Sequence, residues 1–182
     1  MRSKLLNARS TRLLWTAGAG LGSVWAMAPL DAELAAFEAT LSRLLVLFES
    51  APESVVGVQP RPEDWCVKQI ACHLIDSASN NHQRFTRLQR TARLEFAPYD
   101  TEAWVAVEKP EGLAWAQLLG LLKHYNAFIL HLARNLDLAC LGHVWVADGK
   151  EKTLEFLVRD YYRHLDWHIT HLETRLREVG AG

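Results

Sequence analysis

The chain has 182 residues, of which 49% are hydrophobic and 23% are charged, and its formal net charge is -1. This length is enough for one domain with a sizeable core, and the balanced charge gives no electrostatic reason to expect a nucleic-acid partner. The three cysteines are odd in number and lack a CxxC spacing, which argues against a disulfide framework and favours a reducing, cytoplasmic compartment.

Residues 1–30 form an N-terminal extension that has two interpretations. Basic residues precede an uncharged stretch, and Ala26-Met27-Ala28 resembles the cleavage site of a secretory signal. Alternatively, Met27 is the true start of the protein, and we favour this interpretation because several glycines leave the stretch weakly apolar. The protein would be exported only if residues 1–28 are a genuine signal. In either case the stretch buries too little apolar area for stable membrane insertion.

Apolar residues spaced by threes and fours predict four amphipathic helices within a single domain over residues 31–180. The first helix is expected over residues 31–50, and Pro52 ends it. The second begins near Cys66, after two prolines, and continues to Leu88. Its apolar positions alternate in steps of four and three, which is typical of the seam between helices in a bundle.

The last two predicted helices each follow an irregular segment. A loop over residues 95–109 precedes a third helix over residues 110–136. An irregular stretch over residues 137–152, with a turn at Asp148-Gly149, precedes a fourth helix over residues 153–179. No segment shows strand-like alternation of any length. The pattern therefore predicts an all-α protein, an antiparallel four-helix bundle.

Three histidines share the inner face of the fourth predicted helix. His164, His168 and His171 are spaced i, i+4 and i+7. Burying an imidazole without a partner costs on the order of 1 to 3 kcal/mol, whereas a divalent ion accepts the nitrogen lone pairs. The spacing of His164 and His168 suits one ion, and His73 on the second helix is the obvious third ligand. Three such ligands leave an open coordination position, as in catalytic sites.

The alternative is that these histidines bind no metal, because a pair at i, i+4 also arises by chance and is a weak signal alone. Periodicity also places His73 beside the seam of its helix rather than in it. Asp160, one turn before His164, and Asp76, three residues after His73, are candidates to orient a ligand ring if the packing brings them close.

Further polar residues are candidates for binding a substrate. Asn80 and Arg84 lie on the second helix, about two and three turns beyond its candidate ligand, and would suit an anionic group. Asn126 adjoins the seam of the third helix. The alternatives are an exposed helix face for the first two and a buried, satisfied amide for Asn126. Tyr99 and Trp104 in the long loop either cover the cavity as a lid or pin the loop to the bundle.

Two segments match a known family pattern. The first is Trp65-Cys66-Val67-Lys68-Gln69-Ile70-Ala71-Cys72-His73-Leu74-Ile75-Asp76 with a later Arg84-Phe85, close to the pattern Trp-Ser-Val-Lys-Glu-Ile-x-x-His-Leu-x-Asp and Arg-Phe. The second is His164-x-x-Trp167-His168-x-x-His171, similar to His-x-x-His-His-x-x-Gln/His. In these segments the chain resembles the DinB/YfiT-like family of candidate metalloenzymes, and the resemblance covers about residues 31–176.

The resemblance implies a four-helix bundle in a variant up-and-down topology and a divalent ion, zinc or nickel, bound by three histidines. The ligands carried over by position are His73, His164 and His168. His171 then lines the cavity at a position where the family has Gln or His. The chain departs from the pattern at three positions. Cys66 replaces a capping Ser, Trp167 replaces the first His of the His-His pair, and His171 stands where Gln is commoner. None of these departures removes a ligand.

Two kinds of chemistry follow from such an ion, because it activates either a water or a thiol. The first gives a hydrolase, and the second gives a thiol-S-transferase or isomerase with a low-molecular-weight thiol as co-substrate. The family that the chain resembles includes both kinds of enzyme, and both reactions imply a small-molecule substrate. The alternative is a non-catalytic metal-binding or stress-related scaffold, whose site would be sealed or filled by side chains. A homodimer, common among relatives, is a further open alternative.

Overall fold

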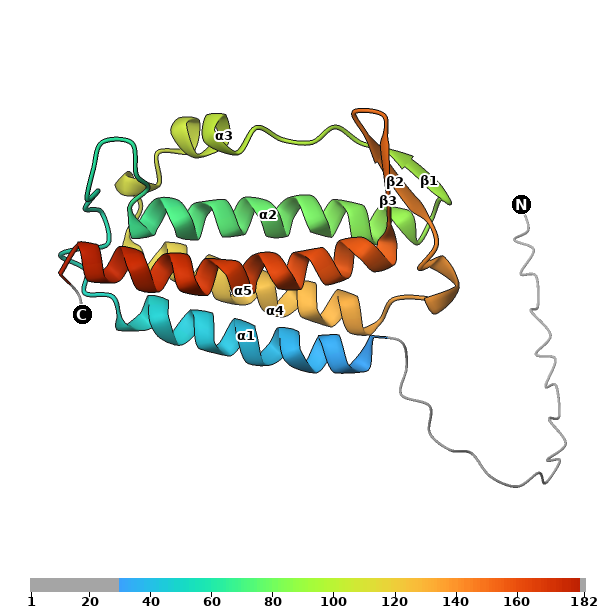
Figure 1. The fold of residues 1–182 in the computed structure, drawn as a ribbon, viewed down its shortest axis with the longest axis horizontal. Helices are drawn as coiled ribbons and strands as arrows, with labels where there is room; N and C mark the ends of the chain where they lie inside the picture. The colour runs from blue at the N-terminus through green and yellow to red at the C-terminus, as the bar shows by residue number, and fades with distance from the viewer. Residues whose placement is uncertain (1–29, 181–182) are drawn as a thin grey trace, which may run out of the picture.

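The computed structural model describes residues 30–180 of the chain (Figure 1). Four long helices pack side by side, which confirms the predicted four-helix bundle. They are α1 (Asp31–Ser50), α2 (Val67–Leu88), α4 (Trp115–Arg134) and α5 (Leu154–Glu178). The predicted N-terminal extension lies outside the described residues except for Leu30, whose side chain is buried in the core.

The helices have an unusual order of directions. Figure 1 shows that α1 and α5 run one way and that α2 and α4 run the other way. Because α2 packs against α4 and α1 packs against α5, each of these neighbouring pairs is parallel. Parallel neighbours need a long connection, and residues 89–114 return along the length of the bundle from the end of α2 to the start of α4. Periodicity, which predicted antiparallel neighbours, does not specify this order.

Local hydrogen bonds explain where two of the helices begin. The Thr153 hydroxyl accepts a hydrogen bond from the Phe156 backbone N–H at 3.1 Å, so it caps α5. At the start of α2, the Gln69 side-chain oxygen accepts a hydrogen bond from the Cys66 backbone N–H at 2.9 Å. These two helices carry the candidate metal ligands, so their first turns fix where the ligands lie.

The core fills the space between the four helices with apolar side chains from their inner faces. Phe37 on α1 is 1% exposed, and its ring meets the edge of Tyr161 on α5 with the centroids 5.6 Å apart. The Phe85 ring on α2 also packs edge-on against this tyrosine, with the centroids 6.3 Å apart. Tyr161 therefore joins three elements of the core close to the candidate ligands on α5.

A small three-stranded sheet, which the sequence pattern did not predict, packs near the end of α2. Its strands are β1 (Arg93–Glu95), β2 (Val144–Ala147) and β3 (Lys150–Thr153), with β1 parallel to β2 and β2 antiparallel to β3. Asp148 and Gly149 both have positive φ, 50° and 71°, as a two-residue hairpin turn of type I′ requires. The predicted irregular stretch over residues 137–152 is thus largely a hairpin, whose strands are too short to show alternation.

The long connection also contains a helix where a loop was predicted over residues 95–109. This helix, α3 (Thr101–Glu108), is capped by the Asp100 carboxylate, which accepts a hydrogen bond from the Ala103 backbone N–H at 3.1 Å. Lys109 ends it with φ at 50°. Pro110 then lies in a separate 3₁₀ turn, and the chain is extended just before α4 begins at Trp115. The predicted start of the third long helix at residue 110 was therefore wrong, since α4 begins five residues later.

A polar cluster holds α3 against α2. The Cys72 thiol donates a hydrogen bond to the Glu108 carboxylate at 3.0 Å, and ligand atoms of Cys72, Asp76 and Glu108 all lie within 4.8 Å of one another. Asp76 is 4% exposed, so burial and the nearby Glu108 carboxylate raise its pKa to about 7. This contact keeps α3 over the part of α2 that carries His73.

The three cysteines are free and buried. Within residues 30–180, no helix combines the length and the apolar character needed to cross a bilayer.

Phe37→Ala is expected to lower the free energy of unfolding by about 3 to 5 kcal/mol, because it leaves a cavity between α1 and α5. Val46 on the same helix is 62% exposed, so the control Val46→Ala should change that free energy by less than about 0.5 kcal/mol. Urea titrations of both variants measure the two values. A loss for Phe37→Ala as small as that of the control would contradict the packing described for α1.

Asp76→Asn is expected to change how stability depends on pH. Folding raises the Asp76 pKa from 3.8 to about 7, so the folded chain keeps a proton that the unfolded chain has released. This group therefore makes the free energy of unfolding fall as pH rises through that range. The stability of Asp76→Asn relative to the unsubstituted protein should increase from pH 4 to pH 8, as urea titrations of chelator-treated protein measure. Asp148→Asn is the control, and a pH-independent difference for Asp76→Asn would contradict the assignment.

Candidate metal centre

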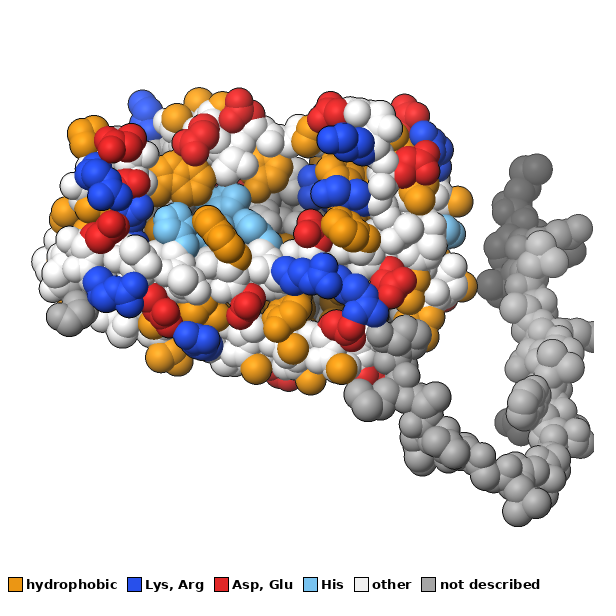
Figure 2. Space-filling view, in the orientation of Figure 1, with side chains coloured by type: hydrophobic (Ala, Val, Ile, Leu, Met, Phe, Trp, Pro, Cys, Tyr) orange, Lys and Arg blue, Asp and Glu red, His pale blue; other side chains and the backbone are white. Residues whose placement is uncertain are grey.

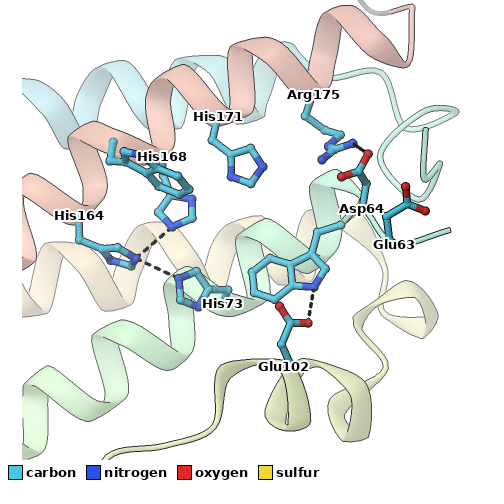
Figure 3. A pocket seen from close by; sticks show the side chains of 10 residues that line it. Glu63, Asp64, His73, Glu102, His164, His168, His171 and Arg175 are labelled. Carbon is cyan, nitrogen blue, oxygen red and sulfur yellow. Dashed lines mark hydrogen bonds and ion pairs between the residues drawn. The ribbon is translucent and has the colours of Figure 1, made fainter. Parts of the chain in front are cut away.

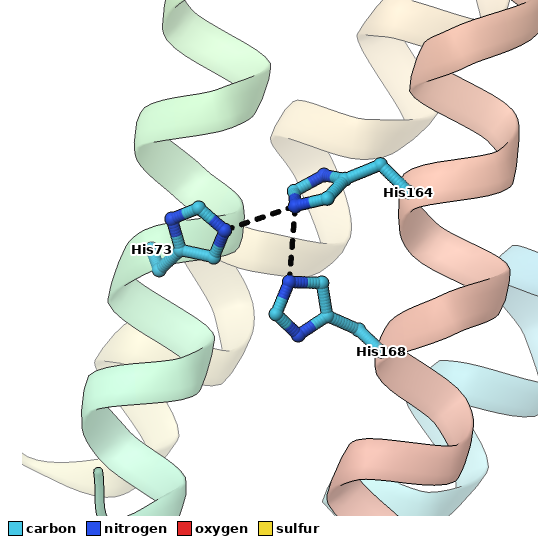
Figure 4. Close-up of side chains that lie close together, drawn as sticks. All are labelled: His73, His164 and His168. Carbon is cyan, nitrogen blue, oxygen red and sulfur yellow. Dashed lines mark hydrogen bonds between the residues drawn. The ribbon is translucent and has the colours of Figure 1, made fainter.

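Three imidazoles from two helices meet at one point in the bundle (Figure 4). The His164 Nε2 atom lies 3.0 Å from His73 Nε2 and 3.0 Å from His168 Nε2. His164 and His168 occupy successive turns of α5, and His73 faces them from α2, which packs against α5. The structure thus brings together the three residues that the sequence singled out, and we call them the histidine triad.

Hydrogen bonds among the three rings cannot satisfy all of their Nε2 atoms. A ring nitrogen of a neutral imidazole carries either a proton or one in-plane lone pair, so His164 Nε2 makes one good hydrogen bond and not two. Two nitrogens bound to one ion at about 2.0–2.1 Å lie roughly 3.0–3.4 Å apart, close to the separations here. The donor set therefore fits a divalent ion that accepts one lone pair from each ring.

The protonation of the triad agrees with this fit. Burial and the neighbouring imidazoles lower the pKa of His73 to about 3 and also lower that of His168. Burial lowers the pKa of His164 as well. The three rings are therefore neutral near pH 7, which is the state that binds metal.

The triad lies at the edge of a cavity of about 370 Å³, seen from close by in Figure 3. Figure 2 shows histidine side chains, in pale blue, visible on the surface of the bundle, and the cavity opens to solvent. Besides the triad, the lining consists of two tryptophans, three acidic residues, His171 and one arginine. These are Trp65, Trp167, Glu63, Asp64, Glu102, His171 and Arg175.

His171 lies in this cavity beside the triad but outside it. Its ring centroid is 5.7 Å from that of His168, and its buried Nδ1 atom has no hydrogen-bond partner within residues 30–180. Partial burial and the positive charge of Arg175 lower its pKa. Arg175 itself is 4% exposed and forms ion pairs with Asp64 at 3.2 Å and with Glu178 at 3.1 Å. His171 therefore lines the cavity, at the position expected from the sequence.

The predicted orienting carboxylates do not contact the triad. Asp160 is half-exposed and pairs with Lys152 at 4.0 Å, and Asp76 faces α3. The partner of His164 Nδ1 is instead the Ser77 hydroxyl at 3.3 Å. Ser77 follows His73 by one helical turn, so a search at i+4 for a hydroxyl would have found it from the sequence.

Two of the predicted polar candidates are satisfied elsewhere in the protein. The Asn80 amide donates a hydrogen bond to the Asp76 backbone oxygen at 3.0 Å, one turn earlier on the same helix. Asn126 accepts a hydrogen bond from the Tyr161 hydroxyl at 2.5 Å and donates one to the Leu122 oxygen at 2.9 Å. The interpretation of Asn126 as a buried, satisfied amide therefore matches the structure.

The long connection forms part of the site, and sequence analysis missed most of this contribution. Glu102 on α3 accepts a hydrogen bond from the Trp65 indole N–H at 3.1 Å, across the cavity mouth. Tyr99 packs its ring against Trp104 with the centroids 4.8 Å apart, and Tyr99 lines a second cavity that also touches His73. Residues 99–104 therefore wall both cavities, and loop aromatics were the only signal in the sequence.

Comparisons with known proteins agree with this architecture. The chain matches the DinB superfamily model over residues 36–172. It is 27% identical over 152 residues to YfiT of Bacillus subtilis (strain 168), named as a candidate metal-dependent hydrolase; the match covers 82% of this chain and 85% of that protein.

Two solved structures share the fold. The structure of Bacillus subtilis YfiT, described as an unusual four-helix bundle, aligns with a TM-score of 0.74 at 22% identity, covering 89% of this chain and 94% of that chain. A mycothiol-dependent maleylpyruvate isomerase aligns with a TM-score of 0.68 at 15% identity, covering 82% of this chain and 67% of that chain. Because the family match extends over most of its length, this protein belongs to the DinB superfamily.

Proposed function

We propose that this protein is a metal-dependent hydrolase of a small molecule, with His73, His164 and His168 as the metal ligands. The observation that carries the proposal is the convergence of their three Nε2 atoms at the edge of an open cavity. When bound there, a divalent ion supplies a Lewis acid with a free coordination position for water or a thiol. Zinc and nickel both suit a set of neutral imidazoles.

The other residues of the cavity position the substrate and move protons. His171 lines the cavity as a neutral imidazole, so its ring can accept a proton from a group bound beside the triad. Trp65 and Trp167 provide apolar walls that limit the access of water. The Trp65–Glu102 hydrogen bond holds one of these walls in place.

Relatives support hydrolysis, since the curated relative YfiT is named as a candidate metal-dependent hydrolase. A second candidate, thiol transfer or thiol-dependent isomerisation, is favoured by a different observation. His73 and His164 line the 370 Å³ cavity and also a second cavity of about 250 Å³. A thiol co-substrate and a second substrate can thus approach the same imidazoles from two sides, as the likeness to a mycothiol-dependent enzyme suggests.

If the protein were a non-catalytic scaffold, we would expect a sealed site, a fourth protein ligand or side chains that fill the cavity. Within residues 30–180, the group of metal-ligand atoms around the triad contains three histidines and no fourth ligand. The cavity beside it is open. Both observations favour an enzyme over a scaffold.

Protein purified without a histidine tag is expected to contain about one divalent ion per chain. His168→Ala should lose this ion, because two imidazoles on two helices form a much weaker site than three. His124 on α4 is exposed, so the matched control His124→Ala should keep it. Elemental analysis by mass spectrometry measures the metal, and circular dichroism checks that both variants are folded. Unchanged metal content in His168→Ala would refute the assigned ligands.

The cobalt-substituted protein separates the two reactions. If thiol transfer is the reaction, adding 2-mercaptoethanol should produce a sulfur-to-cobalt charge-transfer band, because a bound thiol ionises. A hydrolase that binds only water should show no such band. The absorption spectrum is recorded before and after the addition, with ethanol as the control for non-specific effects. Absence of the band with every small thiol tested would rule out the second candidate.

A further inference from the structure

The second cavity continues from the triad along α2, away from the first cavity. It has a volume of about 250 Å³ and lies between α2, α5, the β2–β3 hairpin and the segment around Tyr99. His73 and His164 form one end of its lining, and Arg84, Trp145 and Lys152 belong to the same lining. A molecule in this cavity can therefore contact the triad and the Arg84 side chain together.

Arg84 is a buried cation without a matching anion. Its side chain is on α2, and the residue is only 8% exposed. Within residues 30–180 it forms no ion pair, its Nε atom has no hydrogen-bond partner, and its one hydrogen bond is a long 3.5 Å contact with the Asn81 side-chain oxygen. A guanidinium taken out of water normally has a carboxylate partner, because desolvation without one is expensive.

The surroundings hold this guanidinium in place without neutralising it. Its central carbon lies 4.0 Å from the centroid of the Trp145 ring, and the Trp145 indole N–H donates to the Phe96 backbone oxygen at 2.7 Å. Asp160, the carboxylate of the cavity lining, pairs with Lys152 at 4.0 Å. The charges of Lys152 and Asp160 cancel and the histidines are neutral, so the lining of the cavity carries a net positive charge from Arg84.

We propose that the second cavity binds the carboxylate group of a small organic acid, with the Arg84 guanidinium as its hydrogen-bond donor. A carboxylate accepts two parallel hydrogen bonds from the planar fork of an arginine, and the contact with the Trp145 ring helps to hold that fork in place. Because the cavity is shared with the triad, the acid would extend its reacting end toward His73 and His164. This last part rests on the proposed metal-dependent function, whereas carboxylate binding at Arg84 does not.

The test uses propionate as the probe and the full chain in two forms, chelator-treated and metal-loaded. Titrations are followed by NMR at the Arg84 Nε–H and Trp145 indole N–H signals. We expect saturable shifts with propionate in both forms and none with the neutral isostere propionamide. Arg84→Gln should weaken propionate binding at least about tenfold, and Arg84→Lys, which keeps the charge but loses the fork, should weaken it less. Arg90→Gln, at an exposed position just after α2, is the matched control and should bind as the unsubstituted protein does.

Two results would overturn the proposal. The first is equal binding of propionate by Arg84→Gln and the unsubstituted protein, and the second is tighter binding of inorganic phosphate than of propionate. The link to the triad is tested separately with succinate, whose second carboxylate can reach a metal. Metal loading should tighten succinate binding at least about tenfold more than propionate binding. Absence of this gain would refute the shared site, whereas Arg84-dependent binding of propionate to metal-free protein stands even if the metal assignment fails.

Discussion

Three imidazole nitrogens from two helices meet at one point, and this convergence defines the candidate site. His73 comes from α2, whereas His164 and His168 come from α5. Neutral rings at these distances cannot satisfy one another fully by hydrogen bonds, so folding leaves lone pairs directed at a shared position. The packing of α2 against α5 therefore creates a site for a cation, and the surrounding apolar core keeps the two helices in the register that this requires.

The parallel order of α2 and α4 also shapes the candidate site. It forces a long connection to return along the bundle, and this connection brings α3 and Tyr99 over the ligands on α2. The hairpin adds Trp145 and Lys152 at the opposite end of the second cavity. A bundle with short turns would leave the histidine triad on a bare helical surface, whereas here two cavities meet at His73 and His164.

How well the sequence predicted the site varied from one residue to the next. The convergence of His73, His164 and His168 followed from helical spacing together with a family pattern. Asp160 is as close to His164 in sequence as His168 is, yet it turns toward Lys152 and solvent. Ser77, which contacts His164, lies one helical turn after His73, but only carboxylates were predicted as partners of the ligand rings. Adjacency along a helix limits what a side chain can reach, and packing between elements selects among those options.

Spacing along the chain was enough to predict the four long helices, their approximate ends and the shared face of the histidines, because these follow from a local period of 3.6 residues and from caps and prolines. Packing between elements sets the directions of the helices, the pairing of the three short strands and the position of Arg84 over Trp145. These features join residues far apart in the chain. They depend on how one helix is rotated against the next, and spacing within a single segment carries no information about that rotation.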